Sequence, residues 1–324
     1  MRRRWGVTEK HVQRRIKAFR LDAAGRDYRP FLIVRDVPSL GRSAIVRGLI
    51  TGRNHHWFSD LEYAHFVLLE YSPVIVDIRE QYPLLPREET IEIARELGIR
   101  HPIYPGSDTP IVMTTDIVAT VNGGSPGQAY LPMSINYSSA LSSKDGKSQR
   151  TMEKLLIEQL YWARRGWPLR LCTEKGIPMN RVRNLDMFRG SMAAFEHDHL
   201  NGVMQSFVGH FKAIWTQDCS LNDLLSAAAN ELELSTPETV ALFGRSVWTR
   251  ILPVDLDSHQ IHYELPIRLL DVAAAPVVRP PDQPHVVHGY DLIPNQKDEA
   301  LFRALSQSHR FGPGALRRRA RRHV

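Results

Sequence analysis

The sequence predicts an α/β fold in which helices flank a mixed sheet, followed by an α-rich region and an extended basic tail. Segments with helical and with strand periodicity alternate over residues 1–176, which is typical of a sheet covered by helices. Residues 177–272 have almost entirely helical spacing, and residues 273–324 are rich in proline and lack periodicity. We therefore expect two folded parts and a tail.

Helices in the first part are predicted from apolar residues that recur at helical spacing. The segments are residues 8–20, 61–71, 87–98 and 147–166. Thr8 is the expected N-cap of the first helix, and Ser59 or Asp60 caps the second. Gly98 and Gly166 provide stop signals for the last two.

Strands are predicted where short apolar runs alternate with polar residues. The segments are residues 31–34, 74–84, a hairpin within 114–139, and 169–174. The hairpin is indicated by the Gly/Pro/Ser-rich loop GGSPG between two β-prone runs.

The second part has the order of a winged helix, namely helix, turn, helix and then a two-stranded ribbon. Thr236 is the expected N-cap of the second of these helices, with Pro237 at its first position. A winged helix is a DNA-binding variant of the helix-turn-helix.

Net charge is +7, and it is concentrated at the chain ends. Eight arginines account for it: Arg2, Arg3, Arg4, Arg317, Arg318, Arg319, Arg321 and Arg322. Arginine-rich ends attract nucleic acid phosphates without reading sequence, so Arg317, Arg318 and Arg319 are candidate DNA contacts. The alternative is a solvated tail that aids solubility.

Compartment and redox class follow from what the sequence does not contain. It has neither a membrane-length apolar run nor the apolar core of a signal peptide, so we expect a cytoplasmic protein. Its two cysteines, Cys172 and Cys219, are too few for a disulfide framework or a zinc site and are expected to be buried free thiols.

Four residues form a candidate site for phosphodiester hydrolysis. Glu62 lies on the helix before the sheet and Asp116 on the first strand of the hairpin. Ser134 and Asn136 are two apart on the second strand and so share a face. Mg²⁺ prefers such hard oxygen ligands. By themselves, the same residues are also compatible with ordinary surface carboxylates.

Several motifs in order give a family resemblance. They are Gly25–Pro30, VPSLGRS (37–43), TGRNHHWFSDLE (51–62), DIREQYPLLP (77–86), His101-Pro102, TTD (114–116) and EKLLIEQLYW (153–162). This arrangement resembles TnsA, the endonuclease subunit family of heteromeric cut-and-paste transposases. The resemblance covers about residues 10–175, with a looser similarity over 177–270.

The resemblance implies a restriction-endonuclease-like fold of the PD-(D/E)xK class and a Mg²⁺-dependent nuclease, in which Mn²⁺ can substitute. It implies cleavage of the 5′ strands at transposon ends. The implied partners are double-stranded DNA, a TnsB-like transposase that cuts and joins the 3′ ends, and a TnsC-like AAA+ ATPase. Such a protein would work in the bacterial cytoplasm and associate with the nucleoid when acting.

Carried over by motif, Glu62 and Asp116 match the family's metal-binding carboxylates. Ser134 matches a residue that contributes its backbone carbonyl, which survives a side-chain change. Asn136 stands where the family has lysine, and asparagine cannot supply a positive charge to the transition state. Three explanations stay open: a tolerated variant, a natural loss of activity, or a laboratory substitution. Lys144 or Lys147 is an alternative source of charge.

Further candidates bracket the acidic site. Arg53 and Arg79 are possible phosphate contacts, with ion pairs to Asp60 or Glu80 as the alternative. Two glutamates of the helix at 147–166, Glu153 and Glu158, are candidates for a layer behind the metal ligands or for a solvated face. His55-His56 is expected to contact DNA or to pack locally.

Three functional hypotheses result. The first is a TnsA-type endonuclease, and the second is an assembly subunit of the same complex without cleavage, for which transposition would become copy-in. The third is a stand-alone restriction-like nuclease. The residue at position 136 separates the first two, and a neighbouring transposase gene would separate both from the third.

Overall fold

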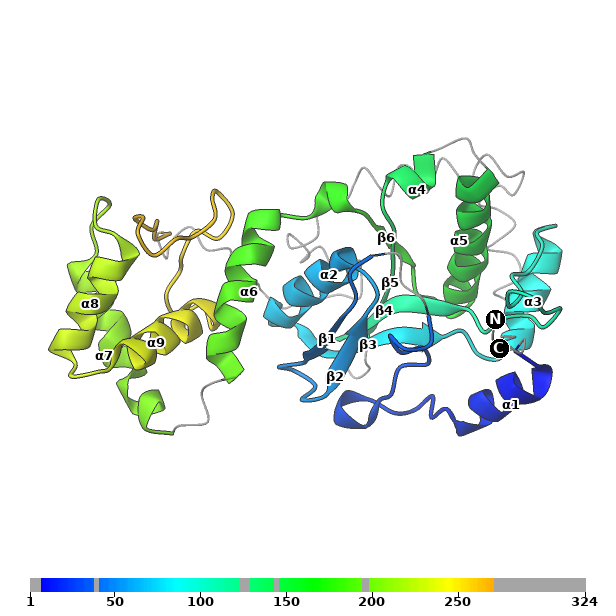
Figure 1. Cartoon of the computed structure of the whole chain (residues 1–324), viewed down its shortest axis with the longest axis horizontal. Helices are drawn as coiled ribbons and strands as arrows, with labels where there is room; N and C mark the ends of the chain where they lie inside the picture. Colours follow the sequence, from blue (N-terminus) through cyan, green and yellow to red (C-terminus); the bar gives the residue numbers. More distant parts are fainter. Residues whose placement is uncertain (1–6, 38–40, 123–128, 143–145, 194–197, 271–324) are drawn as a thin grey trace, which may run out of the picture. The chain divides into compact units, whose positions relative to one another are not determined.

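The computed structural model describes residues 7–37, 41–122, 129–142, 146–193 and 198–270 (Figure 1). These residues divide into two compact units. The first contains the chain up to Leu69 and Pro73–Gly176, and the second contains Glu70–Ser72 and the chain from Ile177. The expected basic tail lies outside the described residues. No helix within the described ranges is long and apolar enough to cross a membrane.

A four-stranded mixed sheet organises the first unit, as predicted (Figure 1). Its strands, in spatial order, are β3 (Ile75–Pro83), β4 (Thr114–Val121), β5 (Ala129–Ile135) and β6 (Arg170–Cys172). The first three are antiparallel, and β6 runs parallel to β5. The predicted hairpin is therefore confirmed as β4–β5, and the parallel addition of β6 requires the long crossover that α5 provides.

Helices precede and connect the strands of this unit. They are α1 (Glu9–Ala18), α2 (Asp60–Tyr71), α3 (Arg87–Glu96), the short α4 (Ser139–Ser142) and α5 (Gly146–Arg164). Adjacent residues Ile117 and Val118 point to opposite faces, and both are buried. Val118 packs in one core with Leu155 and Trp162 of α5. Gly166 has φ +79°, a conformation that favours glycine and ends the α5 segment as expected.

Two local predictions need correction. Residues 31–34 form bends and a turn rather than a strand. Phe31 donates one backbone hydrogen bond to Gln81 of β3 at 3.2 Å, and its side chain packs with Val12 and Val112 in a small core. Conversely, an antiparallel hairpin of β1 (Ala44–Arg47) and β2 (Asn54–Trp57) exists where the polar sequence NHHW gave no strand signal. Tertiary contacts override local propensity at both places.

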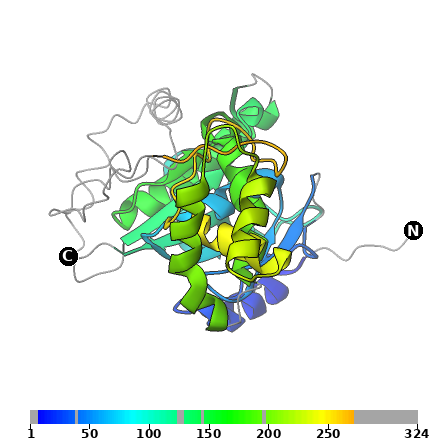
Figure 2. The ribbon, with the colours of Figure 1, turned by 90° about the vertical axis from the view of Figure 1, so that its left-hand side faces the viewer.

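The second unit is helical. It contains α6 (Met179–Ala193), α7 (Asp198–Ile214), α8 (Leu221–Glu231) and α9 (Thr236–Trp248). Helix α9 contacts each of the other three, and Figure 2 shows α7, α8 and α9 packed together. Aromatic pairs hold this core, with Phe243 of α9 against Phe188 of α6 and Phe211 of α7.

The start of α9 is one residue earlier than predicted. Ser235 is the N-cap and forms a capping box with Glu238, which leaves Thr236 inside the helix. After α9, the described residues pair only through isolated bridges such as Val254 with Leu269, rather than through named strands. The winged helix is therefore not confirmed and stays a prediction.

Candidate active site

Glu62 is fixed in the first turn of α2 by hydrogen bonds to the residues before the helix. Its backbone N–H donates to Ser59 Oγ at 3.1 Å, and its carboxylate accepts from the Ser59 hydroxyl at 2.9 Å and from the Phe58 N–H at 3.0 Å. Ser59 rather than Asp60 is therefore the cap. The side chain is nevertheless a buried acid, with 7% of the residue exposed.

Asp116 lies on β4, where the regular pairing with β5 ends. The last paired residues are Ile117 and Met133. Beyond them, Asp116 Oδ2 accepts a hydrogen bond from the Ile135 N–H at 2.7 Å. This contact fixes the aspartate beside Ser134 and Asn136, the two residues that flank Ile135 in the sequence.

Gln81 supports Asp116 and was not singled out in the sequence. It has φ +48° within β3, a conformation that is uncommon for a residue with a side chain. Its amide hydrogen-bonds to Asp116, and its Oε1 accepts from the Thr114 hydroxyl at 3.0 Å. Backbone strain of this kind clusters at functional sites. A buried glutamine in a strand is the only sequence signal, and it is weak.

Glu158, from α5, contributes a third carboxyl to the region. It is buried and receives hydrogen bonds from Thr115 and Ser134, while its Oε1 has no hydrogen-bond partner among the described residues. Glu153 instead pairs with Arg150 at 2.6 Å on the outer face of the helix. Of the two glutamates on this helix, only Glu158 turns toward Asp116.

The three carboxyls influence one another electrostatically. Burial, followed by the charge of Asp116, raises the pKa of Glu62 to about 8. The same two causes raise the pKa of Glu158 to about 8. Burial raises the pKa of Asp116 to about 6, although hydrogen bonds from Ile135 and Gln81 oppose it. Like charges confined in a poorly solvated region hold protons that a bound cation would displace.

Asn136 lies next to this region but brings no charge. Its side-chain amide donates to Ser134 Oγ at 3.3 Å, as expected for residues on one face of the strand. No cation is among the described groups that shift the pKa of Asp116 or Glu158. Lys144 lies outside the described residues, and Lys147 is exposed at the start of α5.

The donor chemistry partly fits a divalent cation. Glu62 and Asp116 offer carboxylate oxygens, which are the ligands that Mg²⁺ prefers, and the unpartnered Oε1 of Glu158 is a third oxygen of the same kind. No group of three or more His, Cys, Asp or Glu side chains in the described chain is arranged to hold a metal ion. The carboxylates therefore approach one another without forming a closed cage.

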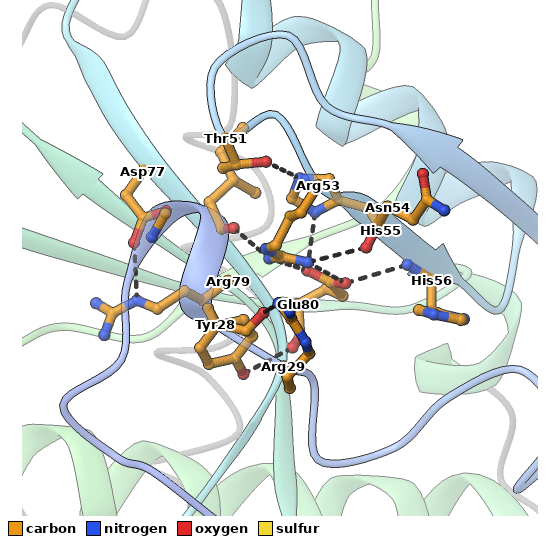
Figure 3. A network of polar contacts seen from close by, with 12 residues as sticks. Tyr28, Arg29, Thr51, Arg53, Asn54, His55, His56, Asp77, Arg79 and Glu80 are labelled. Carbon is orange, nitrogen blue, oxygen red and sulfur yellow. Dashed lines mark hydrogen bonds and ion pairs between the residues drawn. The ribbon is translucent and has the colours of Figure 1, made fainter.

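Arg53 is buried in a network around Glu80 (Figure 3). Its terminal nitrogens donate to the two Glu80 oxygens at 2.8 and 2.6 Å. His55 Nδ1 contacts Glu80 at 2.8 Å, and its Nε2 contacts the Thr51 hydroxyl at 2.8 Å. Burial would raise the pKa of Glu80, but the hydrogen bonds from Arg53 and His55 outweigh it and lower the pKa to about 2.

The expected phosphate contacts of Arg53 and Arg79 are not supported by these positions. Arg53 forms the alternative ion pair with Glu80, and His55 packs locally. Arg79 is also buried, with its Nε 3.4 Å from Asp77 Oδ2. Both guanidinium groups are enclosed in the fold, with 7% and 6% of the residue exposed, and so are out of reach of a DNA backbone. Arg317, Arg318 and Arg319 lie outside the described residues.

Comparison with known proteins agrees with the resemblance noted in the sequence. Residues 72–174 match the family described as TnsA-like endonuclease N terminal. The chain is 41% identical over 170 residues to the Transposon Tn7 transposition protein TnsA of Escherichia coli. The aligned residues make up 52% of this chain and 59% of that protein. The chain thus spans less than two thirds of that relative. The predicted resemblance to TnsA-type endonuclease subunits is confirmed.

Proposed function

We propose that this chain is the endonuclease subunit of a TnsA/TnsB-type transposase. It cuts the non-transferred (5′) strand at transposon ends in a reaction that depends on Mg²⁺, for which Mn²⁺ can substitute. The observation that carries the proposal is the electrostatic coupling of Glu62, from α2, and Asp116, from the hairpin within the matched residues 72–174. Its partners are double-stranded DNA, a TnsB-like transposase and a TnsC-like ATPase in the bacterial cytoplasm.

Each residue has a distinct role in this proposal. Glu62 and Asp116, once deprotonated, would hold the cation, and the Ser134 backbone carbonyl would be a further oxygen ligand. Bound Mg²⁺ supplies Lewis-acid stabilisation of the phosphoryl oxygens and lowers the pKa of bound water. The Phe58 N–H and the Gln81 amide keep the two carboxylates oriented throughout.

A second candidate function is an assembly subunit with impaired cleavage. Asn136 favours this candidate, because its neutral amide donates to Ser134 Oγ and carries no positive charge to stabilise the phosphorane. Loss of one stabilising group of this type costs about 3–4 kcal/mol, or roughly 10²–10³ in rate. Cleavage slowed that far would leave a subunit that binds DNA and its partners.

Strand-specific cleavage of an end-labelled transposon end separates these candidates. The assay contains the partner transposase and compares the chain with Asp116→Ala and Asn136→Lys. Asp116→Ala removes a proposed metal ligand. Asn136→Lys restores the charge that the resemblance implies at this position.

Cleavage of the 5′ strand that is present in the chain and abolished by Asp116→Ala supports the endonuclease. Cleavage that is absent in the chain and appears with Asn136→Lys supports the impaired subunit. Cleavage that persists undiminished in Asp116→Ala contradicts both, because neither allows hydrolysis without that carboxylate.

A further inference from the structure

A cavity of about 880 Å³ lies within the first unit, away from the carboxylates of the candidate active site. Its walls come from β3, β4 and β5, from α5 and the residues after it, and from residues 21–25. They include Arg79, Tyr82, Val118, Tyr130, Trp162 and Trp167. Glu62, Asp116 and Glu158 are not among the described lining residues. This volume is in the range of pockets that bind small organic molecules.

The described lining residues include two cations, Arg79 and Arg165. Arg165 pairs with Glu89 at 2.7 Å, whereas the Arg79 side chain is 7% exposed and faces aromatic rings. The Arg79 guanidinium lies 5.1 Å from the centre of the Tyr82 ring and 5.0 Å from that of Tyr130. The two rings therefore hold the guanidinium in a fixed plane through cation–π contacts. Among the described residues its ion pair is the contact of Nε with Asp77 Oδ2 at 3.4 Å.

The hydrogen-bonding capacity of Arg79 is largely unused. Its Nε has no hydrogen bond and faces Asp77 at 3.4 Å, and its Nη2 makes one long bond to the Thr120 hydroxyl at 3.4 Å. Nη1 has no hydrogen-bond partner in the part of the chain that the structure describes. A buried guanidinium normally satisfies its donors, so these donors point to a ligand group that accepts.

Two carboxylates, Asp22 and Asp77, are among the described residues that line the cavity. Asp77 Oδ1 accepts from the Gly25 N–H at 3.1 Å, and its Oδ2 is buried beside Arg79. Asp22 lines the exposed rim, 3.6 Å from Arg20. The hydroxyl of Tyr82 has no hydrogen bond to any described residue and is a further donor.

We propose that this cavity binds a carboxylate carried on an aromatic or branched apolar body. The carboxylate accepts from Arg79 and Tyr82, and the apolar body packs between Val118, Trp162 and Trp167. Charge-assisted bonds to a planar guanidinium favour a carboxylate over a neutral group of the same shape. The source is either a free organic acid or the C-terminal residue of a polypeptide.

The test measures binding to the full chain by tryptophan fluorescence and by saturation-transfer NMR. Phenylacetate is compared with its neutral isostere phenylacetamide, and acetyl-Gly-Phe is compared with acetyl-Gly-Phe-amide. Each acid is expected to bind about ten times more tightly than its amide, which corresponds to about 1.4 kcal/mol. Tighter binding of the peptide acid identifies a polypeptide source, and tighter binding of phenylacetate a free acid.

Substitutions at an exposed residue of the cavity rim test binding without disturbing the buried core. Val76 lines the cavity and is 46% exposed, so Val76→Glu adds a repelling charge and Val76→Gln is its neutral control. We expect Val76→Glu to weaken acid binding about tenfold and Val76→Gln to leave it unchanged. The circular dichroism spectrum of Arg79→Met is first compared with that of the parent chain. If the two spectra match, the variant should bind the acid and the amide equally well.

Three results would overturn the proposal. They are the absence of saturable binding by either acid, equal affinity for acid and amide, and acid binding that Val76→Glu does not change. None of these readouts depends on DNA cleavage, so a failure here is distinct from a failure of the proposed endonuclease.

Discussion

Asp116 Oδ2 accepts a hydrogen bond from the Ile135 backbone N–H at 2.7 Å. The contact replaces the next rung of the β4–β5 ladder with a side chain. One residue later, the Asn136 N–H donates to the Cys172 carbonyl at 2.9 Å, which continues the pairing of β5 with β6. Position 136 is therefore held by backbone bonds whatever its side chain. A change of residue type there alters charge without moving the strand.

Glu62 stabilises the start of α2 and is also a proposed metal ligand. Two substitutions distinguish the structural role from the ligand role. Glu62→Gln retains an acceptor for the Phe58 N–H but cannot hold a cation as a carboxylate does. We expect little change in stability and, in a cleavage-competent chain, a loss of about a hundredfold or more in cleavage rate. The measurements are urea denaturation and strand-specific cleavage.

Ser59→Ala is the matched control for Glu62→Gln. It removes the N-cap and is expected to cost about 1 kcal/mol in the free energy of unfolding, with cleavage retained. If the two substitutions produced the same pattern, Glu62 would be only a cap.

Glu158 should make the metal-free chain less stable at alkaline pH. Its folded pKa of about 8 lies above its ordinary value of 4.5, so the unfolded chain releases this proton first as pH rises. Stability is then lost between about pH 4.5 and 8. Urea denaturation with EDTA should give a smaller loss over pH 5–8 for Glu158→Gln, and greater stability than the parent at pH 8.

Glu62 and Asp116 shift in the same direction, so the pH dependence should shrink rather than vanish in Glu158→Gln. Parallel pH profiles for the variant and the parent would contradict the burial of an ionisable Glu158.

Glu80 should stabilise the fold in the opposite pH range. Its folded pKa of about 2 lies below its ordinary value of 4.5, so its contribution is present above pH 4.5 and is lost as pH falls toward 2. Glu80→Gln leaves the buried Arg53 unpaired and is expected to cost about 3–5 kcal/mol at neutral pH.

The control for Glu80→Gln is Glu92→Gln, because the Glu92 side chain is 51% exposed. The control should unfold in acid as the parent does. A Glu80→Gln variant as stable as the parent at pH 7 would show that the network around Glu80 contributes no stability.

Gln81 should set the charge state of Asp116. Gln81→Gly relieves the backbone strain at φ +48° and removes the amide that hydrogen-bonds to the aspartate. We expect the pKa of Asp116 to rise above about 6, measured by carbon-13 NMR of labelled aspartate. An unchanged titration would exclude Gln81 as a positioning residue.

Much of this fold was predictable because its elements carry local signals. The apolar stripe of α5, the cap signal before α2 and the hairpin loop before β5 are each determined by neighbouring residues. The sequence left Ser59 and Asp60 as alternative caps, and the structure assigns Ser59. By contrast, β2 has a polar sequence; it pairs with β1, and Glu80, distant in the chain, accepts from His55 of β2 and from the adjacent Arg53 in the interior.

The sequence by itself determined the alternation of helices and strands, the candidate acids Glu62 and Asp116, and the missing charge at Asn136. Only the tertiary structure decided that Arg53 and Arg79 are interior cations, that Gln81 contacts Asp116, and that Glu158 faces the same acidic region. The reason is physical: periodicity depends on near neighbours, whereas burial and charge pairing depend on residues that folding brings together from distant parts of the chain.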